Sequence, residues 1–252
     1  MTLFRSGGVN GGGTSIDPSQ KPASNEKLMN ITKIAMVCLS TGILCASETA
    51  VERLNESTSV LNDVMSAPDK GIPQELLDKS ECIVIVPGLK KAAFVVGGKY
   101  GKGFISCRRP AGGGWSAPAA VRVEGGSVGF QIGGSETDAI MLVMNKRGAE
   151  KLLSSKFTLG GDASVAAGPV GRTSSAGTDA KMQAQILTYS RSRGVFAGVS
   201  LGGATLRPDE DTNMELYGSK LSNETIVMGS TQVPAAASGL IAALTKYSAH
   251  KE

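Results

Sequence analysis

The residues best placed for covalent chemistry lie in a glycine-rich stretch, Gly125-Gly126-Ser127-Val128-Gly129. Its spacing matches the G-x-S-x-G motif of serine hydrolases, in which a strand precedes the serine, a helix follows it and a histidine lies downstream. Here Phe130-Gln131-Ile132 continues the β-prone pattern, and the single histidine, His250, is third from the end. The surroundings of the motif therefore argue against a serine hydrolase.

Residue type and spacing exclude further chemistries. Gly112 to Ala117 has the spacing of a G-x-G-x-x-A dinucleotide fingerprint, but Pro118 follows at once and no helical pattern comes next. The sequence holds no G-x-x-x-x-G-K-[ST] loop, and the one histidine with the two cysteines that lie beyond residue 47 leaves too few ligands for a zinc-type site. We therefore predict no enzyme, no cofactor and no metal. The carboxylates are scattered and form no suggestive pair: Asp138, Asp162, Asp179 and Asp209.

Basic residues are the strongest candidates for a binding site. They stand at predicted turns, and they would form a cationic rim if these turns share one end of a sheet. Such a rim would dock to anionic lipid headgroups, at about 1 kcal/mol per Lys or Arg near a charged membrane. Exposed turns are often basic without a functional reason, so that alternative stays open. The candidates are Lys90, Lys91, Lys99, Lys102, Arg108 and Arg109.

A second set of arginines stands beside glycine-rich breaks. Arg172 follows Gly168-Pro169-Val170-Gly171, and Arg191 and Arg193 precede Gly194. These side chains would line a second anion site or simply fix turns. The formal net charge is only +4, whereas nucleic-acid binding needs a concentrated basic stripe, so we expect no nucleic-acid partner.

The elements that position these residues are mostly strands. Apolar runs recur between glycine- and proline-rich breaks, as in a β-sandwich or barrel. The run at 82–86 ends at Pro87-Gly88, the glycine-rich stretch 97–103 reads as a turn, and 157–167 alternates with the period of a half-buried strand. The other strands are expected at 93–96, 104–108, 119–123, 127–132, 139–144, 183–190 and 195–201.

Helices are expected to cover this sheet. Apolar residues fall on one face of 47–65, with Ser47 as N-cap and acidic residues on the other face. Asn145 caps a helix through Leu153, and a last helix runs from Pro234 to Tyr247. The predicted fold class is α+β: a mainly antiparallel β-sandwich or barrel-like sheet with an N-terminal, a mid-chain and a C-terminal helix packed on it.

The first 47 residues carry a localisation signal. Met29 to Lys33 is a short basic segment, Ile34 to Leu44 is apolar, and Cys45-Ala46-Ser47 offers small residues for cleavage, the pattern of a bacterial secretory signal peptide. We therefore expect residues 1–28 to be a disordered extension or a mis-assigned start, 29–47 a signal peptide and 48–252 one domain in the periplasm or cell envelope. The alternatives are an uncleaved membrane anchor and, with weaker support from Leu44 before Cys45, a lipoprotein.

Two cysteines, Cys82 and Cys107, remain after this leader. In an oxidising compartment they would be able to pair. Two cysteines alone do not make a disulfide framework, which favours two separate small core residues.

The chain resembles the SYLF domain family, known for lipid-binding and actin-binding members, from about Arg53 to Leu244. The segments that carry the resemblance are Phe94-Val95-Val96-Gly97-Gly98, Gly101-Lys102-Gly103, Gly114-Trp115-Ser116-Ala117-Pro118, Gly129-Phe130-Gln131-Ile132-Gly133, Ala167-Gly168-Pro169-Val170-Gly171-Arg172 and Tyr189-Ser190-Arg191-Ser192-Arg193-Gly194-Val195-Phe196-Ala197-Gly198.

The resemblance implies a non-enzymatic module that binds phosphoinositides and other acidic lipids, here in a secreted bacterial member. For an exported protein the available anionic lipids are phospholipids and lipopolysaccharide, and actin binding is not expected. The alternative function is a structural or assembly protein of the cell envelope that binds a protein partner.

Overall fold

The computed structural model describes residues 48–67, 71–94, 96–109, 113–128, 133–154, 156–171, 184–192 and 195–248. The expectations for the extension at 1–28 and the leader at 29–47 lie outside the described residues. The same holds for Arg172 and Arg193 of the predicted second anion site.

The described strands form one curled sheet, antiparallel except for the pairing of β6 with β7. Its order is β5-β9-β3-β2-β1-β4-β7-β6, and β8 also pairs with β7. The α+β class and the barrel-like alternative are thus confirmed. The strands are β1 (Cys82–Phe94), β2 (Val96–Cys107), β3 (Ala119–Val128), β4 (Gly133–Val143), β5 (Phe157–Thr158), β6 (Val165–Ala167), β7 (Ile186–Ser192), β8 (Val195–Gly198) and β9 (Thr205–Pro208).

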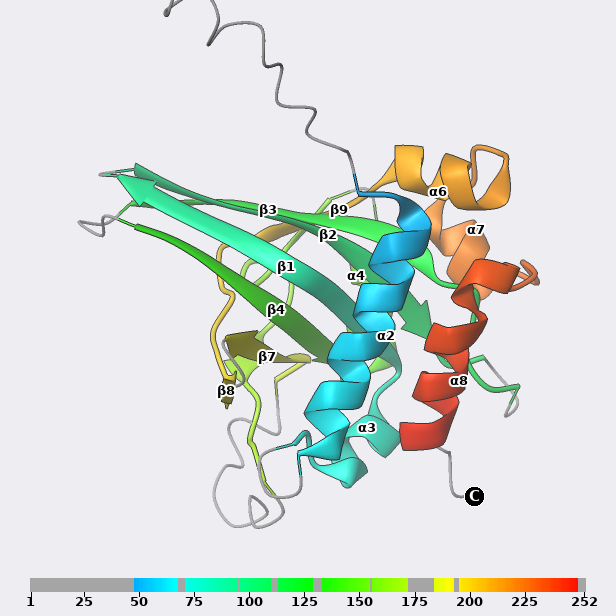
Figure 1. The fold of residues 1–252 in the computed structure, drawn as a ribbon, viewed down its shortest axis with the longest axis horizontal. Coiled ribbons are helices and arrows are strands. Elements are labelled where there is room, and N and C mark those ends of the chain that lie inside the picture. Colours follow the sequence, from blue (N-terminus) through cyan, green and yellow to red (C-terminus); the bar gives the residue numbers. More distant parts are fainter. Residues whose placement is uncertain are drawn as a thin grey trace, which may run out of the picture. The chain divides into compact units, whose positions relative to one another are not determined.

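Helices cover both faces of the sheet at one end. α2 and α8 lie side by side over one face (Figure 1), and their apolar residues pack with Ile83, Phe104 and Leu142 of the sheet. On the other face, α4 and α7 pack on a second cluster that contains Val84 and Met141. The helices are α2 (Ala50–Ser66), α3 (Gln74–Lys79), α4 (Lys146–Leu152), α6 (Glu210–Tyr217), α7 (Asn223–Met228) and α8 (Ser238–Tyr247), with a 3-10 turn at Ala235–Ala237.

The predicted helices are present, and their caps are informative. Asn145 caps α4 as expected, since its side chain accepts a hydrogen bond from the backbone N–H of Gly148. The cap of α2 is Thr49 rather than Ser47. Thr49 and Glu52 form a capping box, in which each side chain accepts from the other residue's backbone N–H. Helix α7 was not anticipated, because its six residues are too few to show a helical period.

The interpretation of 97–103 as a turn is wrong, because these residues belong to β2. The glycines are required by close approach to β1 rather than by a change of direction. A Cβ on Gly103 would lie 2.0 Å from the carbonyl oxygen of Ile85, and one on Gly101 would lie 2.8 Å from Cγ1 of Val86. β1 likewise continues through Pro87-Gly88, where it holds one more residue than either neighbouring strand and forms a bulge.

The prediction of one strand at 157–167 is also wrong, because a glycine turn divides it. Gly160 has φ +84°, a left-handed conformation that suits glycine, and the chain turns there between β5 and β6. The Asp162 carboxylate closes this turn by accepting a hydrogen bond from the Thr158 backbone N–H at 2.6 Å. Conversely, β3 runs without a break through Gly125 and Gly126.

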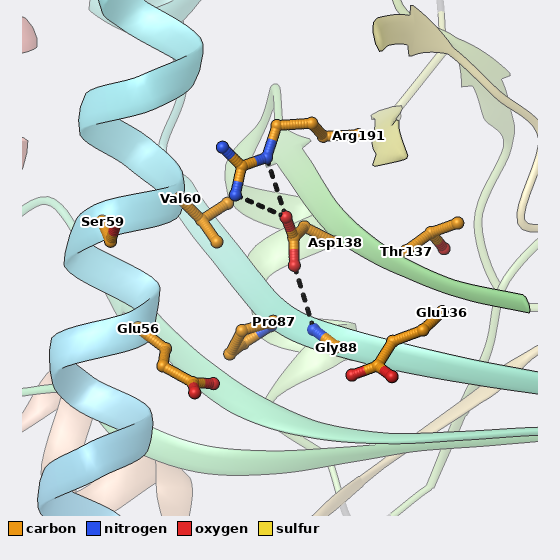
Figure 2. Close-up of a pocket in the computed structure, with 9 residues that line it drawn as sticks. All are labelled: Glu56, Ser59, Val60, Pro87, Gly88, Glu136, Thr137, Asp138 and Arg191. Atoms are coloured by element: carbon orange, nitrogen blue, oxygen red, sulfur yellow. Dashed lines mark hydrogen bonds and ion pairs between the residues drawn. The ribbon is translucent and has the colours of Figure 1, made fainter. Parts of the chain in front are cut away.

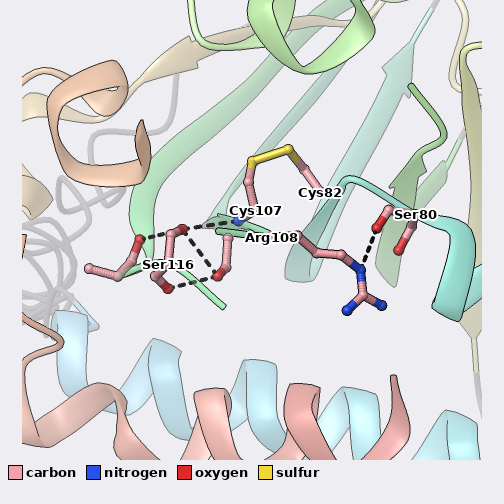
Figure 3. The surroundings of a disulfide bond; sticks show 7 residues. Ser80, Cys82, Cys107, Arg108 and Ser116 are labelled. Carbon is pink, nitrogen blue, oxygen red and sulfur yellow. Dashed lines mark hydrogen bonds between the residues drawn. A yellow bond between two sulfur atoms is a disulfide. The ribbon is translucent and has the colours of Figure 1, made fainter. Parts of the chain in front are cut away.

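Cys82 and Cys107 form a disulfide (Figure 3), so the preference for two separate thiols is wrong. The two residues are direct partners in the register of β1 and β2, which sequence alone does not show. Beside them Arg108 donates hydrogen bonds to the carbonyl oxygens of Ser80, Leu77 and Ser248. The disulfide therefore joins the two strands at the helix-covered end of the long hairpin, and Arg108 ties this end to the segment before β1 and to the end of α8.

The disulfide closes a loop with a sequence separation of 25 residues. Reduction of the wild-type protein is expected to lower its free energy of unfolding by about 3 kcal/mol, because the cross-link restricts the unfolded chain. Urea unfolding with and without reductant, followed by far-UV circular dichroism, measures this. The variant with both Cys82→Ala and Cys107→Ala is the control, since reductant must leave its midpoint unchanged. Equal midpoints for the wild type in both conditions would contradict the cross-link.

Candidate functional site

The predicted cationic rim does not form as one surface, because its members lie at different levels of the sheet. Arg108 and Arg109 follow β2 at the disulfide end, nine and ten residues after Lys99, which corresponds to about 30 Å. Arg108 stacks on Trp115 at 4.7 Å, and burial lowers its pKa. Arg109 donates to the carbonyl oxygen of Thr231 at 3.5 Å. Both arginines hold the chain together at this end.

Lys102 is also paired within the fold. Its Nζ lies 2.8 Å from Oδ2 of Asp209, a carboxylate that is only 1% exposed. Burial by itself raises the pKa of Asp209, but hydrogen bonds from Lys102 and Thr212 outweigh it and hold that pKa below the ordinary value. Lys102 is thus the counterion of a buried carboxylate, not a free surface cation.

The remaining three lysines lie together in the part of the sheet that no helix covers. We call this part the distal sheet; it comprises residues 89–94, 96–100, 124–128 and 133–137. In Figure 1 these ends of β1 to β4 extend to the left, past α2, while the helices stand over the other end. The described sheet residues that pack under α2 and α8 all lie outside the distal sheet.

Lys91 and Lys99 form the most unusual pair of this region. They are direct partners in the register of β1 and β2, so they share one face, with Ser135 and Gly125 as the next partners outward. Burial and then the charge of Lys99 lower the pKa of Lys91. Within the described part of the chain, neither lysine has a carboxylate at ion-pair distance. Like charges directly opposite each other are destabilising, so this pair favours an external anion.

The opposite face of the distal sheet is open and carries small residues. Lys90 and Tyr100 are partners there, and Tyr100 is 49% exposed. The next register row toward the strand ends is exposed and contains only Gly134, Ala92, Gly98 and Gly126.

A cleft of about 500 Å³ lies between α2 and the edge of the distal sheet (Figure 2). It holds Arg191, one of the predicted anion-site residues, but that guanidinium is occupied. Its Nε donates to Asp138 at 2.8 Å, and its Nη1 donates to Asp63 of α2. Asp138 also accepts from the backbone N–H of Gly88 at 3.0 Å. Arg191 therefore links α2 to the sheet across this cleft.

The charge of the cleft disfavours an anionic ligand. Glu56 and Glu136 line it beside Asp138, and the pKa of Glu56 is raised by burial and then by the charges of Glu48 and Asp138. Among the described residues no group of three metal-ligating side chains comes together. The predicted second anion site is thus not supported at Arg191.

Sequence reasoning missed one cationic pair. Arg122 of β3 and Arg207 of β9 are register partners, and both approach Glu124, at 3.0 and 3.5 Å. Neither Nε is aligned for a hydrogen bond. The pairing of β3 with a strand more than 80 positions later leaves no local signal. Because Glu124 neutralises only one of these charges, the flank of the distal sheet gains a further positive charge.

Comparison with known proteins gives a consistent family. Residues 124–247 match the family model Ysc84, described as "Las17-binding protein actin regulator". The chain is 34% identical over 199 residues to human SH3 domain-containing YSC84-like protein 1, covering 79% of this chain and 57% of the relative. It is 38% identical over 172 residues to the fission yeast (Schizosaccharomyces pombe) SH3 domain-containing protein PJ696.02, covering 67% and 40%.

The budding yeast (Saccharomyces cerevisiae) protein YSC84 is 35% identical over 184 residues, covering 71% of this chain and 38% of that protein. The chain thus spans about half the length of the curated relatives it matches. Within the described residues, no helix has the length and apolar character needed to cross a bilayer.

The assignment of Lys102 to the fold predicts a large loss of stability when it is replaced. Lys102→Met leaves Asp209 buried without its counterion and is expected to cost about 3–5 kcal/mol of unfolding free energy, measured by urea denaturation at pH 7. Lys99→Met makes the same change at an unpaired position and is expected to stay within about 0.5 kcal/mol of wild type.

The pH dependence of the Lys102→Met defect has a definite sign. The folded pKa of Asp209 in the wild type lies below its unfolded value, so the contribution of the ion pair is present above the unfolded pKa. It is lost as the pH falls through the folded pKa. The stability gap between wild type and Lys102→Met should therefore narrow below about pH 4. A gap that stays constant into acid would contradict the role given to the pair.

Proposed function

We propose that this chain is a non-enzymatic module that docks to anionic phospholipid headgroups. It matches the Ysc84 family model over residues 124–247 and is similar to YSC84-like proteins over most of its described length. The observation that carries the proposal is the Lys91–Lys99 pair. Two lysines held opposite each other, without a carboxylate at ion-pair distance among the described residues, make a site for a phosphate group. A phosphate oxygen between two ammonium groups would offset their mutual repulsion.

The surroundings of the pair favour a membrane-borne phosphate over a soluble one. Lys90 lies on the other face of the same strand, where Glu136 is its register partner. Arg122 with Arg207 adds one net positive charge at the flank beside Glu124. A bilayer rich in anionic lipid meets cations of several neighbouring strands at once, whereas a single soluble phosphate contacts only one pair. Electrostatic attraction of this kind weakens as salt is raised.

We further propose that residues 29–47 act as a leader and that the domain from residue 48 functions in the periplasm or cell envelope. The Cys82–Cys107 disulfide supports this localisation, since disulfides persist in oxidising compartments and are rare in the cytosol. The anionic lipids met there are phospholipids and lipopolysaccharide. Fractionation of expressing cells tests the localisation, and recovery of the protein only in the cytosol would count against it.

Neutralising the lysine pair is expected to weaken docking to vesicles. The variant with Lys91→Gln and Lys99→Gln should lose about 2 kcal/mol, or about thirtyfold in affinity, for vesicles that contain anionic phospholipid at low salt. Co-sedimentation with neutral and anionic vesicles measures this. The matched control changes the same charge at the opposite end of the sheet, with Lys146→Gln and Lys246→Gln, and should bind like wild type.

Two outcomes would overturn the docking of the lysine pair to anionic lipid. One is equal binding of all three proteins to anionic vesicles. The other is full competition by a soluble phosphate ester, glycerol phosphate, at concentrations near those of the lipid. That result would identify a soluble phosphate compound as the ligand of the same two lysines.

A second candidate function follows from the names of the relatives. The matching family model is described as an actin regulator that binds Las17, although an exported protein is not expected to meet actin. This candidate predicts that the chain co-pellets with filamentous actin at physiological salt, and that the pair of changes Lys91→Gln and Lys99→Gln does not abolish pelleting. A protein that remains in the supernatant at all actin concentrations would leave lipid docking as the only function proposed.

A further inference from the structure

Strand β4 has a free edge in the distal sheet. From Asp138 onward β4 lies between β1 and β7, because Asp138 is the register partner of Arg191. Residues 133–137 pair with β1 on one side, and on the other side no described strand pairs with them. In Figure 1 this part of β4 extends to the left past β7. Alternate residues of 133–137 therefore turn their backbone N–H and C=O groups outward, where no described strand bonds to them.

This edge is also open to approach. Gly134, Ser135 and Glu136 are exposed, and the first two have side chains too small to shield the backbone. Natural sheets usually protect an edge strand with charged side chains, a proline or a covering segment. Here Glu136 is the only charged residue within 133–137. An extended peptide can add to such an edge as one more strand of the sheet.

A pocket for one side chain of an added strand lies directly beside the edge. The cleft of about 500 Å³ is lined by Glu136 and Asp138 of β4 and by Glu56 of α2. Figure 2 shows the carboxylates of Glu56 and Glu136 on either side of Pro87-Gly88. Glu136 faces α2, because it is an even number of positions from Ile140, which packs under that helix. A residue added opposite Glu136 therefore directs its side chain toward the cleft.

The charge of the cleft indicates which residue enters it. Arg191 already binds two of its carboxylates, and Lys90 stands opposite Glu136 in the register, although no ion pair joins the two. Five acidic groups thus face three basic ones, which leaves a net negative charge. The acidic groups that line the cleft or act on it are Glu48, Glu56, Asp63, Glu136 and Asp138, and the basic ones are Arg53, Lys90 and Arg191.

We propose that the outer edge of β4 at residues 133–137 binds an extended basic peptide, with a lysine or arginine side chain in the cleft beside Glu56 and Glu136. Main-chain hydrogen bonds give such complexes their affinity, and a pocket for alternate side chains gives them specificity. The residues of the peptide that point to the other face are neutral or acidic, because Lys91 and Lys99 lie on that face. The site is distinct from the lysine pair that docks to lipid.

A second copy of this chain fits the edge less well than a basic peptide. Pairing of two β4 edges would bring Glu136 and the acidic cleft of one copy against the same groups of the other, and like charges on paired strands are destabilising. The end of β3 beyond Glu124 also has no outer partner among the described strands. It contains no basic residue that would enter the cleft.

Binding of a defined peptide tests the backbone and the charge separately. The probe is a fluorescently labelled peptide of alternating lysine and threonine, and its binding is followed by fluorescence anisotropy at low salt. One control peptide carries glutamate in place of lysine, and the other carries N-methyl groups along its whole backbone, which remove the N–H donors. Each control is expected to bind at least about tenfold more weakly than the probe.

Matched variants of the protein locate the site. Glu56→Gln with Glu136→Gln removes two charges that face the cation and is expected to weaken binding of the probe about tenfold at low salt. Glu75→Gln with Glu150→Gln makes the same change at exposed positions of α3 and α4 and should bind like wild type. Urea unfolding should show the cleft variant to be at least as stable as wild type, since the change relieves repulsion between carboxylates.

Hydrogen exchange reports the added strand directly. In the complex, amide exchange at residues 133–137 should slow, because carbonyl groups of the peptide accept hydrogen bonds from the outward N–H groups. Exchange at residues 97–100 of β2, which is paired on both sides, should stay the same. Protection that is confined to α2 would place the peptide on the helix and overturn strand addition.

Three further results would overturn the inference. One is equal binding of the glutamate peptide, and another is equal binding of the N-methylated peptide. The third is a dimer of this chain, detected by analytical ultracentrifugation, that excludes the probe, since a second copy would then occupy the edge. Lipid docking stands or falls separately. Lys91→Gln with Lys99→Gln changes the other face of the sheet and should bind the probe like wild type.

Discussion

The bulge at Pro87-Gly88 is the constraint on which the arrangement of the sheet depends. β1 carries one residue more there than β2 or β4, so the alternation of its side chains reverses beyond that point. Before the bulge the even positions, such as Val84, face the core under α4 and α7; after it the odd positions, such as Leu89, do. Lys91 therefore lies on the face of Lys99, and Lys90 lies on the other.

Glycines in β2 make this bulge possible. No side chain fits at Gly103, where a Cβ would meet the backbone of Ile85, and one at Gly101 would collide with Val86 and Leu89. The close approach bends the hairpin and carries its far half beyond the helices. One half of the hairpin is thus buried on both faces and the other half is left open. This difference follows from a few residues, rather than from the apolar content of the chain as a whole.

The sequence predicted which segments are helices and strands better than it predicted the residues at which they begin and end. The capped helix after Asn145 and the strand expected at 183–190 are local patterns, and both elements are present, the strand as Ile186–Ser192. The stretch 97–103 was misread because glycine has two uses, turning the chain and admitting close packing, and only the neighbouring strand shows which applies. The Cys82–Cys107 pairing and the face of Lys91 depend on register, which a single extra residue changes.

The candidate site was predicted only in part, because its geometry also depends on register and on distant segments. Lys91 and Lys99 were named as lysines of two turns, and they are in fact partners on adjacent strands. Lys102 and Arg108 have the same residue types and similar surroundings in the sequence, yet Asp209 and the carbonyl oxygens near Ser80 occupy them. What separates a structural cation from a binding one is its partner, and these partners are contributed by segments distant in the chain.

The position of the free cations on strands bears on how they bind. A lysine in a flexible loop loses backbone as well as side-chain freedom when it meets a ligand, whereas Lys91 and Lys99 have their backbones fixed by hydrogen bonds on both sides. The disulfide and Arg108 fix the same hairpin at its other end. The contacts at one end of β1 and β2 thus offset the loss of backbone entropy when the strands become ordered. The other end is therefore already ordered when it meets a charged surface. Few cations are then enough for a surface on which each contributes about 1 kcal/mol.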